Sequence, residues 1–173
     1  MAPIIVTALI GEPDFTTLDA LRRQHYPADR NQLRAHLTMF HHLPPSCVDE
    51  LKQLLKDEAR GNDPAARLSG LINLGGGVAF RVESPDLDDI CARISERFAP
   101  MLMPQDRHAG RAHITVQNKG KAPEARAVLD QLSGDFQARA LNLTGLAAWY
   151  YRGGPWEQIA AYAFKTGQTI KRR

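Results

Sequence analysis

The sequence predicts a two-lobed α+β fold with pseudo-twofold symmetry, and two observations lead to that prediction. Strand-like and helix-like segments alternate in both halves of the 173-residue chain. A five-residue segment, Arg-Ala-His-x-Thr with x apolar, occurs at residues 34–38 and again at 111–115. We therefore expect residues 1–173 to form a single domain of two lobes, with one copy of the segment in each lobe.

In the first half of the chain, proline residues and the period of the apolar side chains mark the elements. Apolar residues recur at helical spacing before Pro27, and polarity alternates before Pro44 and Pro45, which end a strand. Asp49 follows Ser46 by three positions, which is typical of a helix cap. The expected elements are a strand over 3–10, a helix over 14–24, a strand over 35–40 and a helix capped by Ser46.

The second half repeats this alternation. Gly75, Gly76 and Gly77 predict a hairpin turn, since they lack the Lys-Ser/Thr pair of a phosphate-binding loop. Pro85 after Ser84 is typical of a first helical turn. The expected elements are strands over 68–74 and 78–82, a helix from Ser84-Pro85, a strand over 112–117, a helix from Pro123 to Gly134, and strands near 136–144, 146–151 and 156–164.

Composition favours a folded protein of the cytoplasm. Hydrophobic residues make up 43% of the chain and charged residues 24%, with a net charge of +3, too mild to indicate nucleic acid by itself. No apolar run is long enough to cross a bilayer, and residues 3–10 lack the basic start of a signal peptide. Cys47 and Cys91 have no CxxC spacing, so we expect no disulfide framework and no zinc site.

The repeated segment has the residues of a metal-free acid–base site. Residues two apart in a strand point the same way, so His36 shares a face with Thr38, and His113 with Thr115. If the two strands face each other across a cleft, two imidazoles and two hydroxyls converge on one tetrahedral anion. One imidazole can then remove a proton while the other supplies one, and the hydroxyls can donate to phosphate oxygens.

Both copies fit one family motif completely. His36-Leu37-Thr38-Met39 and His113-Ile114-Thr115-Val116 are similar to the His-x-Thr-x motif that occurs twice in the two-histidine (2H) phosphoesterase superfamily. Within that superfamily the chain resembles the branch of bacterial 2′-5′ RNA ligases and RNA 2′,3′-cyclic phosphodiesterases. One departure is that Ala35 and Ala112 stand where many relatives have proline, which weakens assignment to a subfamily.

The resemblance implies both architecture and chemistry. It implies two antiparallel-rich sheets that flank a central cleft, with helices packed outside and no cofactor or metal. It implies hydrolysis or reversible formation of phosphodiesters, at 2′,3′-cyclic phosphates or 2′-5′ linkages. By motif position His36 and His113 are the catalytic acid and base, in an order left open, and Thr38 and Thr115 bind phosphate.

Five further residues are candidates for substrate binding. Arg34 and Arg111 precede the histidines by two positions, so they could flank a phosphate or be solvated strand-end charges. Alternation puts Phe40 and Gln117 on the faces of the catalytic pairs, where Phe40 could stack on a base, although a place in the core is favoured. Tyr150 lies in an aromatic cluster from which one ring could reach the cleft.

Other aromatic and histidine residues have plainer interpretations. His41 and His42 are expected at a solvent-exposed strand end, because no carboxylate or cysteine has suitable spacing to join them in a metal site. Trp156, after the Gly153-Gly154-Pro155 turn, is expected to pack rather than to recognise a ligand.

The sequence hypothesis is an enzyme, a monomeric cytoplasmic phosphodiesterase that acts on RNA ends or on small cyclic or 2′-5′-linked nucleotides. Two alternatives are left open. One is a non-catalytic module that binds phosphorylated nucleotides or RNA in the same cleft. The other is a metal enzyme whose metal is held by histidines.

Overall fold

A computed structural model describes residues 1–107 and 111–165. Helices and strands alternate along them as the sequence predicts. The helices are α1 (Asp14–His25), α2 (Val48–Glu58), α3 (Pro85–Phe98) and α4 (Ala122–Asp135), with short 3₁₀ turns at Pro45–Cys47, Ala99–Met101 and Pro104–Asp106. The strands are β1 (Ile4–Ile10), β2 (Leu37–Leu43), β3 (Ala66–Asn73), β4 (Val78–Glu83), β5 (His113–Gln117), β6 (Arg139–Leu141), β7 (Leu143–Tyr150) and β8 (Glu157–Ala163).

The strands form two four-stranded sheets in which all neighbours are antiparallel. One sheet has the order β2-β1-β7-β8 and the other the order β5-β4-β3-β6. The predicted α+β fold with two antiparallel sheets is therefore confirmed. Each sheet has one motif strand at its edge, β2 in the first and β5 in the second. The lobes are not the two halves of the sequence, because β7 and β8 return to the sheet of β1 and β2.

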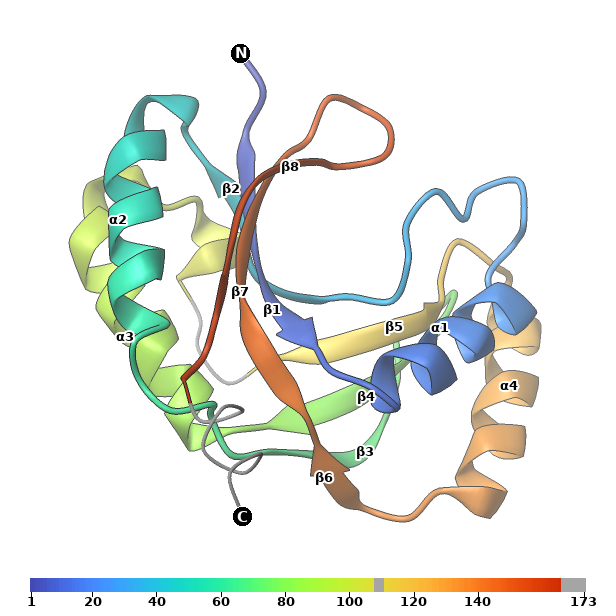
Figure 1. The fold of residues 1–173 in the computed structure, drawn as a ribbon. Coiled ribbons are helices and arrows are strands. Elements are labelled where there is room, and N and C mark those ends of the chain that lie inside the picture. The colour runs from blue at the N-terminus through green and yellow to red at the C-terminus, as the bar shows by residue number, and fades with distance from the viewer. Residues whose placement is uncertain (108–110, 166–173) are drawn as a thin grey trace.

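The helices lie in two pairs on opposite sides of the sheets (Figure 1). On one side α2 contacts β7 and β8, and α3 contacts β3. On the other side α1 contacts β5, and α4 contacts β3 and β4. Helix α1 therefore packs directly against the second motif strand, which matters for the site described below.

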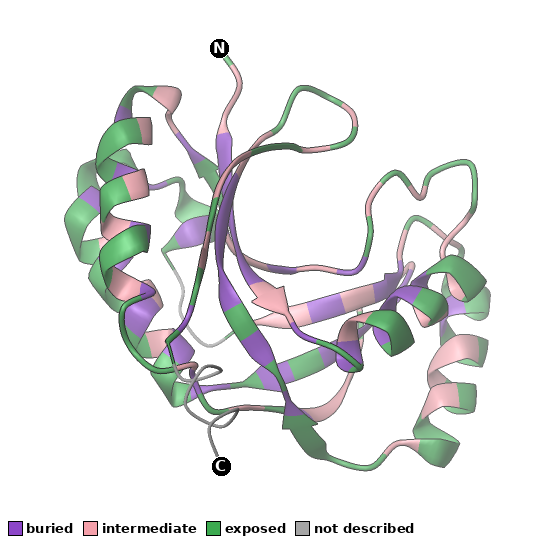
Figure 2. Cartoon of the chain, in the orientation of Figure 1, coloured by how far each residue is buried: buried purple, intermediate pink, exposed green. Residues whose placement is uncertain are grey.

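Among the described residues, one hydrophobic core contains side chains from both sheets, and Figure 2 shows buried residues along the strands of each. Burying a large apolar side chain completely contributes roughly 1.5–3 kcal/mol. Both motifs are anchored in this core, because Leu37 and Ile114 are each fully buried. The largest fully buried side chains are Phe40, Phe98, Ile4, Leu18, Leu37, Leu43, Leu51, Leu55, Leu68, Leu87, Ile94 and Ile114.

The two predicted helix caps have different outcomes. Ser84 is the N-cap of α3, where its hydroxyl accepts a hydrogen bond from the Leu87 amide at 3.1 Å. The prediction for Ser46 is wrong. After Pro44 the chain forms a 3₁₀ turn over Pro45–Cys47. Helix α2 therefore begins at Val48, with Cys47 at the N-cap position and no side-chain cap.

The predicted glycine hairpin joins β3 to β4. Gly75 adopts a φ of 88°, and its amide donates to the Asn73 side-chain oxygen at 2.8 Å. At Gly77 a β-carbon would lie 1.9 Å from the Gln117 carbonyl oxygen, so only glycine lets the turn lie against the end of β5. Within the described residues, no helix combines the length and the apolar character that a membrane span requires.

Candidate active site

The two motif histidines are held in the same way. His36 directly precedes β2, and its Nδ1 lies 2.7 Å from the Arg34 carbonyl oxygen. His113 begins β5, and its Nδ1 lies 2.8 Å from the Arg111 carbonyl oxygen. A carbonyl only accepts hydrogen bonds, so Nδ1 must carry the proton in each ring. When such an imidazole is neutral, it keeps the lone pair of Nε2 for another partner.

Both motif strands contain a bulge at the fourth motif position. Thr7 pairs with Thr38 while Val6 pairs with Phe40, which leaves Met39 as an extra residue in β2. Likewise Ala79 pairs with Thr115 while Val78 pairs with Gln117, which leaves Val116 as the extra residue in β5. A bulge reverses the side-chain alternation beyond it.

The bulges change the faces that strict alternation gives to Phe40 and Gln117, and they agree with the favoured interpretation of Phe40 as a core residue. Alternation puts both residues on the histidine faces, but the extra residue turns each of them to the core side of its sheet. Phe40 is 1% exposed and Gln117 is 4% exposed. Phe40 is therefore a core residue with no free ring face for a base, and Gln117 is enclosed at the end of its strand.

The two motifs come near each other through β2, β5 and the buried Arg22. The strands β2 and β5 contact each other. From α1, Arg22 donates from Nη1 to the Thr115 carbonyl oxygen at 3.1 Å and from Nε to the Leu33 carbonyl oxygen at 3.0 Å. Arg22 thus connects the second motif to the segment that leads into the first.

Burial determines the charge state of His36. Desolvation lowers its pKa to about 4, against the opposing effect of the Arg34 carbonyl. Positive charge on Arg22, His41 and His113 lowers the pKa of His36 further, so all three residues lie within electrostatic range of the ring. His36 is consequently neutral at neutral pH.

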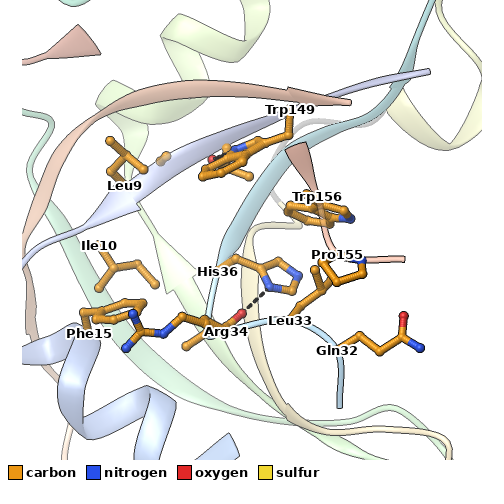
Figure 3. Close-up of a pocket in the computed structure, with 13 residues that line it drawn as sticks. Leu9, Ile10, Phe15, Gln32, Leu33, Arg34, His36, Trp149, Pro155 and Trp156 are labelled. Carbon is orange, nitrogen blue, oxygen red and sulfur yellow. Dashed lines mark hydrogen bonds between the residues drawn. The ribbon is translucent and has the colours of Figure 1, made fainter. Parts of the chain in front are cut away.

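A pocket of about 420 Å³, here called the tryptophan pocket, opens beside His36 (Figure 3). The ring of Trp156 lies 4.7 Å from that of His36, centroid to centroid, and 6.3 Å from that of Trp149. Trp149 is fixed by a 2.8 Å hydrogen bond from its Nε1 to the Thr7 hydroxyl. The pocket is lined by Thr7, Ala8, Leu9, Ile10, Phe15, Gln32, Leu33, Arg34, Ala35, His36, Trp149, Pro155 and Trp156.

The tryptophans occupy the place suggested for Tyr150. Tyr150 pairs with the fully buried Ile4, so it lies on the core side of the sheet, with the Arg152 guanidinium 5.1 Å from its ring centroid. Trp149 points to the opposite side. Trp156 was expected to pack, and the ring on which it packs is that of His36. Sequence spacing does not predict this contact, because it depends on where the turn before Trp156 lies relative to His36.

A second pocket, here called the small pocket, has a volume of about 170 Å³. Thr38 and His113 both line it, whereas His36 lines the tryptophan pocket and Thr115 lines neither. One residue from each motif therefore meets in the small pocket. Its lining residues are Thr38, Met39, Phe40, His41, Leu87, Asp88, Cys91, Ser95, Gln105, Asp106, Arg111, Ala112 and His113.

The two arginines that precede the histidines lie at one pocket each. Arg34 lines the tryptophan pocket, with its Nε 3.5 Å from an Asp19 carboxylate oxygen and its guanidinium 4.5 Å from the Phe15 ring centroid. Arg111 lines the small pocket and is exposed. Both arginines are thus placed where a bound anion could reach them.

His41 has a carboxylate partner that sequence spacing did not reveal. Its Nδ1 lies 3.1 Å from Oδ1 of Asp106, and the amides of His41 and His42 donate to the same carboxylate at 2.8 and 2.9 Å. Burial by itself raises the pKa of Asp106, but these hydrogen bonds bring it below its ordinary value. The two residues are 65 positions apart, so no local pattern predicts the pair.

The two cysteines are present as thiols that burial keeps protonated at neutral pH. Cys47 and Cys91 are free thiols, and burial raises the pKa of both, that of Cys91 to about 12. Among residues 1–107 and 111–165 no three His, Cys, Asp or Glu side chains are grouped so that they could hold a metal ion.

Comparison with known proteins identifies the family. The family model of the 2′-5′ RNA ligase superfamily matches residues 11–155. This chain belongs to that superfamily. The matched region contains both motifs and Trp149, and it ends at Pro155, directly before Trp156.

Solved structures similar to this member of the 2′-5′ RNA ligase superfamily share its fold at low sequence identity. TT0787 of Thermus thermophilus has a TM-score of 0.59 at 13% identity, covering 94% of this chain and 97% of its own. Escherichia coli LigT complexed with 3′-AMP has a TM-score of 0.58 at 13% identity, covering 95% and 99%. A structure described as a phosphoesterase has a TM-score of 0.56 at 14% identity, covering 96% and 100%. No curated protein matches the chain.

Proposed function

We propose that the protein is a metal-independent phosphodiesterase that hydrolyses 2′,3′-cyclic phosphates of nucleotides or RNA ends. His36 and His113 act as the acid–base pair, and Thr38 and Thr115 bind the phosphate. Superfamily membership supports an enzyme of phosphoester chemistry. The complex of E. coli LigT with 3′-AMP supports a nucleotide as the substrate.

The observation that carries this proposal is the duplicated geometry of the motifs. Each histidine binds the carbonyl two residues before it through Nδ1, and each motif ends in a bulge. Packing alone does not require two imidazoles with the same orientation on two different sheets. Two rings with free Nε2 atoms are what paired proton transfer requires.

The charge state of His36 supports an assignment of roles. With a pKa of about 4, His36 is the unprotonated partner at neutral pH, and so the general base. It removes a proton from water as the water oxygen bonds to phosphorus. The bond between phosphorus and one ribose oxygen breaks, and protonated His113 gives that oxygen its proton. If a ribose hydroxyl takes the place of water, the same proton transfers join its oxygen to phosphorus as the bond to one ring oxygen breaks, which opens the cyclic phosphate and is a ligase reaction.

The tryptophan pocket supports a nucleoside as the group next to the phosphate. Binding pockets for small molecules measure about 300–1,000 Å³ and are mostly apolar, with few polar groups. Trp149 and Trp156 offer aromatic surface beside His36, and nucleobases stack on such rings. We place the base of the reacting nucleotide there.

The test is an assay of the purified protein with 2′,3′-cyclic mononucleotides and 2′-5′-linked dinucleotides, in the presence of a metal chelator. We expect hydrolysis to a nucleoside monophosphate, and a loss of about 10²–10⁴-fold in kcat for His36→Gln or His113→Gln. His42→Gln, which alters an exposed neighbouring histidine, is the control and should keep full activity. Unchanged turnover in either motif variant would reject the proposal.

The same assay separates the enzyme from a non-catalytic nucleotide-binding module. A module would bind cyclic nucleotide without releasing product, whereas the enzyme converts it. Inhibition by the chelator would instead favour a metal enzyme. We further propose that the protein acts as a monomer in the cytoplasm, where two free thiols suit reducing conditions.

A further inference from the structure

His41 lies on the motif side of β2 and lines the small pocket. Because Met39 is an extra residue in the strand, the residue after Phe40 returns to the side on which Thr38 lies. The His41 side chain is 53% exposed and lines the small pocket together with Thr38 and His113. A third imidazole is thus placed where one residue of each motif meets.

Asp106 fixes the orientation of that imidazole. The carboxylate is 1% exposed and accepts hydrogen bonds from the His41 ring and from the amides of His41 and His42. Nδ1 of His41 therefore carries a proton, and Nε2 is the ring nitrogen left for the pocket. His36 and His113 are oriented by the same device, but through carbonyl oxygens.

The carboxylate gives His41 a different role from the two motif histidines. The carboxylate at Nδ1 leaves Nε2 as the nitrogen that faces the pocket, and Nε2 is a charged hydrogen-bond donor whenever both ring nitrogens carry a proton. The lowered pKa of Asp106 supports its ionised state. The other charged or titratable groups that line the small pocket are Arg111, His113, Cys91 and Asp88, and His36 lies within electrostatic range.

The size of the small pocket indicates what this donor meets. At about 170 Å³ it has less than half the volume of the tryptophan pocket, which favours a group of the size of a phosphate there. Thr38, Arg111 and His113 in the same pocket are further donors for phosphate oxygens.

We propose that His41, oriented by Asp106, is a third histidine that contacts the substrate and donates a hydrogen bond from Nε2 to a non-bridging phosphate oxygen. The inference rests on the proposed function, since it assumes that the phosphate binds at Thr38 and His113. It assigns Asp106 as a positioning residue that acts through His41.

The test compares the affinities of two ligands that differ by one phosphate, 3′-AMP and adenosine. His41→Asn keeps a donor near the position of Nδ1 for Asp106 but removes Nε2. His42→Asn is the matched control, because its side chain is exposed and only its backbone amide binds Asp106. Calorimetric titrations are made near pH 6, below the ordinary pKa of histidine, and thermal melting confirms that each variant folds.

We expect His41→Asn to weaken binding of 3′-AMP about 10- to 100-fold, since a hydrogen bond to a charged group contributes roughly 1.5–3 kcal/mol. Adenosine should bind both variants as it binds the unaltered protein, and His42→Asn should bind 3′-AMP normally. Equal affinity of the unaltered protein and His41→Asn for 3′-AMP would overturn this inference and leave the proposed function standing. No binding of 3′-AMP by the unaltered protein would overturn both.

Discussion

The partly enclosed ring of His36, directly before β2, leads us to expect that the stability of this protein depends on pH. Burial lowers the folded-state pKa of His36 to about 4, whereas an unfolded histidine titrates near 6.5. Above pH 6.5 the ring is neutral in both states. As the pH falls from about 6.5 to about 4, the unfolded chain binds a proton that the folded chain does not, so stability is lost across that window.

His36→Gln tests this dependence because it removes the titrating group. Relative to the variant, the unaltered protein should lose on the order of 1–3 kcal/mol of unfolding free energy between about pH 6.5 and 4. Urea denaturation at several pH values measures the difference. Parallel pH profiles for the two proteins would show that the folded ring titrates normally.

The position of Trp156 beside His36 allows a quantitative prediction about substrate binding. Removing a ring on which a base stacks costs about 1–3 kcal/mol, so Trp156→Ala should raise the KM of a 2′,3′-cyclic nucleotide roughly 10- to 100-fold. Tyr151→Ala removes an aromatic ring that is 45% exposed and lines neither pocket, and serves as the control. If both variants have the KM of the unaltered enzyme, the base does not stack on Trp156.

At the scale of elements, Arg22 connects α1 to the second motif strand. The guanidinium is buried, and burial lowers its pKa. Arg22→Met leaves the carbonyls of Leu33 and Thr115 without this donor, so we expect a loss of about 2–5 kcal/mol in unfolding free energy. Arg23→Met is the matched control, because that side chain is 67% exposed, and it should change stability by less than about 1 kcal/mol.

Urea denaturation of the two arginine variants gives this comparison directly. An equal and small effect of both substitutions would mean that the contact between α1 and β5 does not depend on Arg22. A large effect of Arg22→Met accompanied by lower kcat would indicate that the position of β5 depends on the helix.

The helices and strands could be predicted from the sequence because the patterns that mark them are local. The candidate site could be predicted only in part. Apolar periodicity and Ser84-Pro85 are read within a few residues, which is why α3 begins as predicted. A bulge has no comparable signal, so strict alternation placed Phe40 and Gln117 on the wrong side of their strands. The pairing of His41 with Asp106 and the contact of Trp156 with His36 depend on how distant segments meet, which no local pattern encodes.

At the scale of the whole molecule, the chain path joins the two lobes into one structure. Strands β7 and β8 return from the second sheet to the first, and one hydrophobic cluster contains residues from both sheets. Neither sheet can lose its structure without exposing apolar surface of the other. Most domains of fewer than about 150 residues unfold in one cooperative transition. Because of the shared core, we expect the same of this slightly longer chain.

Two probes on different sheets test this cooperativity. Trp149 and Trp156 report on the first sheet through fluorescence, and the thiol of Cys91 in α3, which packs on β3, reports on the second through its labelling rate in a Cys47→Ala variant. The two urea midpoints should coincide, because a shared core unfolds as one unit. Separate midpoints would mean that the lobes fold independently, and the alignment of His36 with His113 would then depend on a weaker interface than the continuous core implies.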